Sequence, residues 1–137
     1  MDRVHKHLEF LQLTITRMGA NSFLLKGWTV TLVAALFALS ADNSERLFTL
    51  LALIPATMFW GLDGYFLWQE RRFRIVYDHV RKLNDEDVDY AMHYPEVEEQ
   101  DKGWLAATFS RTLFAFHGFL VVAILSVYMI ERCLNGA

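Results

Sequence analysis

The pattern of apolar and polar residues along the chain predicts helices, and three of them are long enough to cross a membrane. Residues 26–41, 47–68 and 112–130 are mostly apolar with few charges. A helix rises ~1.5 Å per residue, so roughly 20 apolar residues cross a ~30 Å hydrocarbon core. The second and third runs meet this length, and the first does so if the residues just before it lie at the interface. We therefore expect three transmembrane helices.

A different pattern flanks the first two runs, where apolar residues recur every three or four positions. This spacing places one apolar stripe along a helix and is typical of helices that pack in pairs. The predicted seam consists of Leu8, Leu11, Ile15, Phe73, Val76 and Val80. In an antiparallel pair, residues at equal depth have numbers with a nearly constant sum, and the two stripes match on that basis. Segments 1–25 and 69–84 are therefore predicted to form a cytoplasmic two-helix stalk.

The connection between the first two runs is the short segment DNSER, residues 42–46, in which Asp42, Asn43 and Ser44 are of the helix-capping type. Such a short link forces the two helices to run antiparallel. The predicted fold is a single all-α integral membrane domain, residues 1–137. Its first two transmembrane helices form a long antiparallel hairpin that continues into the stalk.

Charged residues near the membrane are predicted to pair across the hairpin. The constant sum places Lys26 level with Asp63 and Arg17 level with Glu70. A lone charge inside the hydrocarbon is costly, which favours pairing at equal depth. The alternative is that Lys26 snorkels to the interface and Asp63 faces water.

Lysine and arginine are concentrated before the first run and after the second. Positive residues favour the cytoplasmic side, so we expect the N-terminus and residues 69–103 inside and the C-terminus outside. Residues 85–103 are strongly acidic. We interpret them as a solvated cytoplasmic connector, or alternatively as a docking site for a basic partner or a signalling protein.

Composition agrees with a membrane protein, since 54% of the residues are hydrophobic and mean hydropathy is +0.21. The net charge of −3 argues against a nucleic-acid binder, which normally has a basic face. The single cysteine, Cys133, excludes an internal disulfide and a cysteine-based zinc site.

No motif for catalysis or for a bound cofactor or metal is found, and we expect no enzyme. His5 and His7 lie two apart and point to different helix faces, and His117 is interpreted as a structural, hydrogen-bonded residue. A membrane-embedded enzyme would need Asp63, Glu70 and His117 around one pocket, and the predicted arrangement does not bring them together.

Gly61 and Gly64 flank Asp63 and let another helix approach closely, which suggests contacts between subunits. The alternative is a locally loosened helix near Pro55.

Three segments resemble a widespread group of small bacterial membrane proteins: RMGANSFLLKGW, FWGLDGYFLWQERRFRIVYD and FSRTLFAFHG. The resemblance covers about residues 10–130. In layout the group is similar to the SLATT-type membrane effectors of anti-phage systems, and some members are associated with TIR-like proteins. The polar positions carried over are Arg17, Asn21, Ser22, Lys26, Asp63, Glu70, Arg71 and Arg74. FHG departs from the FYG-like form of the group, so no role is carried over to His117.

The resemblance implies a homo-oligomeric effector of the bacterial inner membrane that permeabilises the membrane when triggered from the cytoplasm. Its expected partners are membrane lipid, further copies of the chain and a cytosolic signalling protein or signal molecule. The alternative is a non-enzymatic adaptor that anchors or regulates a cytosolic signalling partner.

Overall fold

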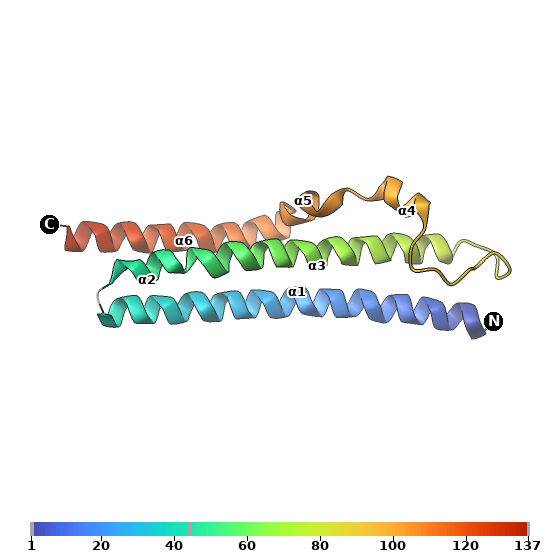
Figure 1. Cartoon of the computed structure of the whole chain (residues 1–137), viewed down its shortest axis with the longest axis horizontal. Coiled ribbons are helices and arrows are strands. Elements are labelled where there is room, and N and C mark those ends of the chain that lie inside the picture. The colour runs from blue at the N-terminus through green and yellow to red at the C-terminus, as the bar shows by residue number, and fades with distance from the viewer. Residues whose placement is uncertain (1, 44, 137) are drawn as a thin grey trace.

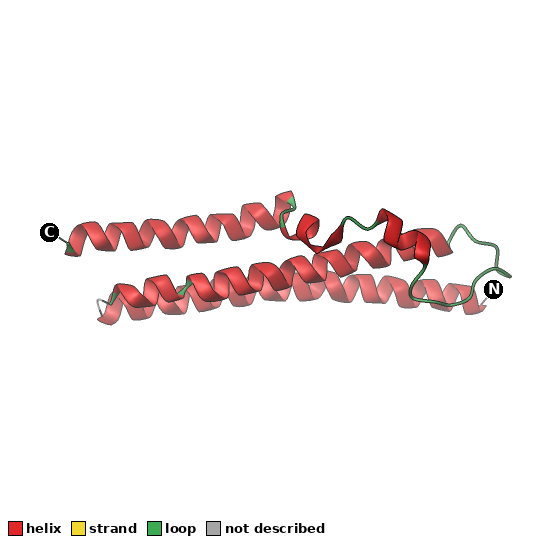
Figure 2. Ribbon diagram, turned by 45° about the horizontal axis from the view of Figure 1, so that its top comes forward, coloured by secondary structure: helices red, strands yellow, loops and turns green. Residues whose placement is uncertain are grey.

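The structure is a computed structural model that describes residues 2–43 and 45–136. Within these ranges the chain forms α1 (Asp2–Asn43), α2 (Arg46–Leu51), α3 (Leu53–Val80), α4 (Pro95–Gln100), α5 (Gly103–Thr108) and α6 (Arg111–Asn135), and no strand. Figure 1 shows α2 and α3 between α1 and α6, all with nearly parallel axes. The longest loop joins α3 to α4 (Figure 2). We call the end of the bundle with this loop and the N-terminus the connector end.

Three helical stretches are long and apolar enough to cross a membrane: Arg3–Asp42, Arg46–Val80 and Arg111–Asn135. They contain the three predicted runs. Many of their large apolar side chains point outward, and Phe23 and Phe119 are 77% and 71% exposed. Apolar surface on this scale is rare on soluble monomers and is what lipid-facing helices present.

The second apolar run is divided into α2 and α3 at Ala52. Pro55 has no N–H, and its ring crowds the carbonyl group four residues earlier, which disturbs the helix at this turn. The helical path nevertheless continues past the break, since Ala52 N donates to Phe48 O and Thr49 O at 3.3 Å each.

The turn before α2 differs in detail from the predicted caps. Glu45 is the N-cap of α2 and makes no side-chain capping bond, while Asp42 and Asn43 belong to α1. Ser44 lies outside the described residues.

The predicted seam residues lie in the apolar interior of the connector end. Leu11, Val76 and Val80 are fully buried or nearly so, Ile15 is 7% exposed, and Leu8 and Phe73 pack at the edge of the same core. α3 ends at Val80, four residues before the predicted end of its stalk segment, because residues 81–83 form a turn.

The acidic connector differs from the solvated loop that we expected. Its acidic side chains are largely exposed, but Val88, Tyr94 and Val97 are buried in the same core as Leu11 and Val76. Three apolar side chains spaced among acids thus anchor the segment to α1 and α3. Pro95 begins α4 at a first-turn position that tolerates its missing N–H. The connector is a folded part of this end.

Candidate functional site: a buried polar cluster that joins three helices

The carboxylate of Asp63 lies completely buried where α1, α3 and α6 meet. The Ser22 hydroxyl donates to Oδ1, while Lys26 Nζ and His117 Nε2 lie 2.6 Å and 2.8 Å from Oδ2. Lys26 Nζ also donates to Ser22 Oγ at 2.9 Å. We refer to Ser22, Lys26, Asp63 and His117 as the Asp63 cluster.

Local sequence accounts for each position in the cluster. Ser22 and Lys26 are four residues apart, so both lie on the same face of α1. Asp63 is on α3, and His117 is in the second turn of α6. Every helix long enough to cross a membrane therefore contributes to one carboxylate, and the loss of any partner affects the contact between helices.

His117 packs against two aromatic rings and leaves one polar atom without a partner. Trp60 stacks on its ring at 5.9 Å with an interplanar angle of 8°, and Phe116 packs edge-on at 5.0 Å. Nε2 must carry a proton to donate to the carboxylate, whereas Nδ1 is buried and makes no hydrogen bond within the described residues. A neutral ring with its proton on Nε2 satisfies this geometry at the smallest electrostatic cost.

With a neutral His117, the cluster contains one positive and one negative charge. Buried charges of this kind persist when they are paired and hydrogen-bonded, and three donors to one carboxylate meet that condition. The Lys26 side chain is only 19% exposed. The alternative in which Lys26 snorkels to the interface also required Asp63 to face water. Asp63 is fully buried, so this part of the alternative is wrong.

Asp63 and His117 are in contact, a pairing that we did not predict. Glu70 lies elsewhere and pairs with Arg74 on its own helix at 2.7 Å. The predicted Arg17–Glu70 pair is not formed between these described residues, and Arg17 is exposed.

Helix α5 of the same chain packs against Gly61 and Gly64, the two glycines beside Asp63. A Cβ on Gly64 would collide with Thr108 Oγ1 and lie 2.9 Å from Thr108 Cα. Trp104 Nε1 donates to Gly61 O at 2.9 Å, and Trp60 Nε1 donates to Thr108 O at 2.8 Å. The close approach that we assigned to another subunit is therefore made within the chain, and it positions the start of α6.

A second polar cluster, which we did not predict, joins α1, α2 and α6 at the end opposite the connector. Thr49 Oγ1 donates to Glu131 Oε2 at 2.8 Å, and Ser40 Oγ donates to Glu131 Oε1 at 2.9 Å. Ser40 and Thr49 are almost fully buried. The constant sum that pairs Lys26 with Asp63 also pairs Ser40 with Thr49, so this part of the contact had a signal in the sequence.

The geometry allows the Asp63 cluster to hold one pair of opposite charges between the three helices. It gives no substrate access in this conformation, because both side chains are fully buried. No group of His, Cys, Asp and Glu that could hold a metal ion is found in residues 2–43 and 45–136.

The fold and the site together define a class: an all-helical protein with three helices able to cross a membrane and an ionisable cluster buried between them. Comparisons with family models, curated proteins and solved structures find no significant match for this chain.

Proposed function

We propose that the protein is a homo-oligomeric effector of the bacterial inner membrane, which permeabilises the membrane when it is triggered from the cytoplasm. The observation that carries this proposal is the Asp63 cluster. Ionisable residues inside a membrane are costly and usually mark a pathway or a switch. Here one carboxylate binds groups from every helix able to cross a membrane.

In this proposal α1 to α3 form a hairpin in the membrane, and the connector end is a stalk in the cytoplasm. The basic residues support this orientation, since Arg71, Arg72, Arg74, Arg81 and Lys82 follow the second apolar stretch. The C-terminus is then outside. The contact between Lys26 and Asp63 lies near the cytoplasmic boundary of the hydrocarbon core.

The cluster suits a switch because its stability depends on water. In a dry contact between packed helices, the attraction between two charges often does not recover the free energy of hydration that they lose. Apolar residues of similar size in the same place often make the packed state more stable. Opening a water-filled conduit beside the cluster would hydrate Lys26 and Asp63. The charges therefore favour the open state relative to an apolar site.

Oligomerisation follows from the thinness of the chain, since three helices around a filled interior enclose no conduit. The outward apolar surface of α1 and α6 provides area for lipid and for neighbouring subunits. By the resemblance described above, anti-phage defence is the setting that we propose, and the signal would come from a cytosolic protein or molecule.

The second candidate is a non-enzymatic adaptor that anchors or regulates a cytosolic signalling protein. The folded connector favours it, because Val88, Tyr94 and Val97 fix an acidic surface at the end of α1 and α3. An adaptor needs such a surface, whereas it does not need the buried charges.

The test is controlled expression in bacteria with a potential-sensitive dye, with and without phage infection. We expect the wild-type chain to depolarise the cells, and the variant Lys26→Met/Asp63→Leu/His117→Phe to reach the membrane in equal amount without depolarising them. Lys6→Met/Asp42→Leu removes the same charges at exposed positions and should act like the wild type. Unchanged potential with the wild type in both conditions would contradict the effector and leave the adaptor.

A further inference from the structure

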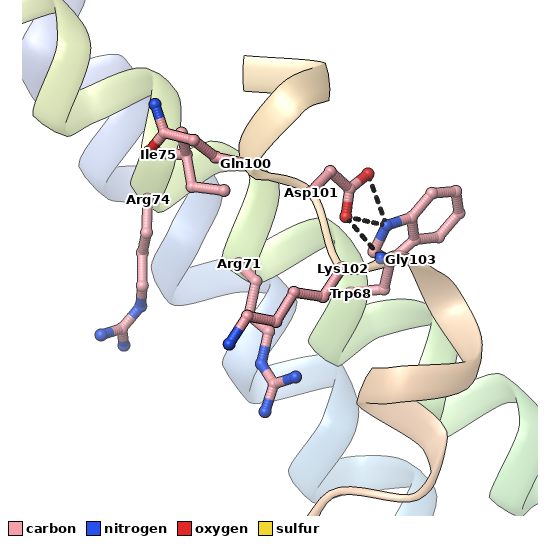
Figure 3. A pocket seen from close by; sticks show the side chains of 8 residues that line it. All are labelled: Trp68, Arg71, Arg74, Ile75, Gln100, Asp101, Lys102 and Gly103. Carbon is pink, nitrogen blue, oxygen red and sulfur yellow. Dashed lines mark hydrogen bonds between the residues drawn. The ribbon is translucent and has the colours of Figure 1, made fainter. Parts of the chain in front are cut away.

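A basic cavity of about 330 Å³ lies on α3 where the chain passes from α4 to α5. Its lining consists of Trp68, Arg71, Arg74, Ile75, Gln100, Asp101, Lys102 and Gly103. Figure 3 shows the ends of the three basic side chains pointing to the same side, away from the Asp101 carboxylate. The Asp63 cluster is a different site, since none of its four residues lines the cavity.

Two of the three cations in this cavity are not neutralised by the protein. Arg71 and Lys102 are exposed and have no ion-pair partner among the described residues, whereas Arg74 binds Glu70. The acidic group of the lining, Asp101, is already engaged. Trp68 Nε1 donates to its two oxygens at 2.8 Å and 2.9 Å, and Arg72 Nε lies 3.5 Å from Oδ2.

The backbone between α4 and α5 fixes Lys102 beside α3. Gly103 N donates to Asp101 Oδ1 at 2.9 Å. Gly103 also has a positive φ, a conformation that favours glycine. The resulting turn carries Lys102 toward Arg71. The lining also contains apolar groups, Ile75 and the Trp68 ring, and the Arg72 guanidinium lies over that ring at 5.2 Å.

We propose that this cavity binds a phosphate-bearing anion. Arg71 and Lys102 hold the phosphate, and Trp68 contacts an apolar or planar part of the ligand. Guanidinium and ammonium groups are the usual phosphate ligands of proteins, and an aromatic neighbour adds contact area. Two sources share this chemistry: the headgroup of an anionic phospholipid and a soluble nucleotide. That this cavity receives the cytoplasmic trigger rests on the proposed function. The binding of a phosphate-bearing anion does not depend on it.

The binding test uses the full chain in a maltoside detergent, which contains no phosphate, and calorimetric titration with two probes. The lipid probe is dioctanoylphosphatidylglycerol and the soluble probe is AMP. We expect saturable binding of one of them, which identifies the source. Each charge-assisted contact is worth about tenfold in affinity or more, so Arg71→Gln/Lys102→Gln should weaken binding about 100-fold.

Two variants separate the cavity from general charge. Arg3→Gln/Lys82→Gln makes the same charge change at exposed positions elsewhere and should bind like the wild type. Arg71→Lys/Lys102→Arg keeps both charges and should retain most of the affinity. Absence of binding for both probes, or equal loss in the two Gln variants, would overturn the proposal.

Depolarisation is measured separately on the same variants. Wild-type depolarisation without binding of either probe would refute the cavity and leave the effector intact. Binding without depolarisation by the wild type would refute the effector and leave the cavity.

Discussion

The two halves of the α1–α3 pair are held together by different contacts. At the connector end the helices meet through large apolar side chains, with Leu11, Val76 and Val80 fully buried or nearly so. In the other half the fully buried residues of this pair are small or polar, as Ala52, Ala56 and Asp63 are, and the apolar cluster there is completed by Val33 and by Ile124 of α6. Lys26 binds Asp63 in the same half. The same two helices therefore change their way of packing about halfway along.

This difference is the one expected if the connector end lies in water and the other half in lipid. In water, burial of apolar surface holds helices together at roughly 25 cal/mol per Å². Lipid is as apolar as leucine, so in a membrane close packing of small residues and polar contacts take over. Large apolar residues in the second half point outward instead, as Phe23 and Trp28 do. The change of contacts supports a membrane boundary between the two halves.

The largest effect is expected at the connector end, where the Leu11 side chain is fully buried. Leu11→Asp should destabilise this end by about 3–5 kcal/mol, because a carboxylate would enter an apolar core. Gln12→Asp on the neighbouring exposed face is the control and should change little. The measurement is limited proteolysis of the purified protein, with cleavage in residues 2–20 and 81–100 followed over time. Equal cleavage of the two variants would contradict an apolar seam at this end.

The sequence predicted the contacts that arise between neighbouring segments. The seam residues could be found because helical spacing is local, and Lys26 and Asp63 because a short turn fixes the relative depth of α1 and α3. The constant sum of residue numbers applies only to two helices joined by such a turn. It also pairs Ser40 with Thr49, although it gives no hint of Glu131 on α6.

Contacts of α6 could not be predicted in this way. Twenty-seven residues, 85–111, separate the stalk from the third apolar run, so they fix neither the depth nor the rotation of α6. His117 therefore had no assigned neighbour. Val88, Tyr94 and Val97 lie in an acidic segment without a continuous helical repeat, and their burial depends on the surface that α1 and α3 provide.

The second prediction concerns the polar half. Lys26→Met should destabilise the bundle by about 2–3 kcal/mol, because it leaves the buried carboxylate without its cationic partner. Asp63→Leu should cost less, since the Lys26 side chain is partly exposed and can reach the interface. Both are measured as loss of thermal stability in detergent.

Variants that replace two or three residues of the Asp63 cluster with apolar residues test this prediction further. Lys26→Met/Asp63→Leu still leaves His117 and Ser22 without their acceptor, so recovery should be partial, and adding His117→Phe should complete it. Strict additivity of the three losses would show that the groups do not interact. At the connector end no second substitution should rescue Leu11→Asp in this way.

The third prediction tests the small-residue contact. A Cβ added to Gly64 would lie 2.8 Å from Thr108 Cβ and 2.9 Å from Thr108 Cα. Gly64→Ala should cost about 1–2 kcal/mol, because backbone must move to make room for the methyl group. Gly27→Ala on α1 meets nothing within 4 Å. It should be neutral or slightly stabilising, as alanine favours a helix. Thermal stability of the two variants in detergent decides the matter, and a loss shared by both would indicate a general intolerance of side chains.

The smallest effect is expected from a polar contact at the connector end. The Tyr94 hydroxyl donates to Asp89 Oδ1 at 2.7 Å. This hydrogen bond lowers the pKa of Asp89, while burial and then Asp89 raise the pKa of Tyr94 to about 12. A lowered carboxyl pKa stabilises the fold above about pH 4, and that contribution is lost as the pH falls further. A raised phenol pKa means that the folded state binds its proton more tightly, so this contribution holds below about pH 10 and is lost between pH 10 and about 12.

Tyr94→Phe removes both contributions. Its melting temperature should therefore lie slightly below that of the wild type between pH 5 and 9, and the gap should narrow at pH 3 and at pH 12. Tyr90→Phe keeps the ring that packs edge-on against His7 and should show no such dependence. A gap of the same size at pH 3 and pH 7 would mean that the hydroxyl acts independently of the Asp89 charge, and no gap at pH 7 would mean that Tyr94 stabilises this end through its ring alone, as the apolar seam does.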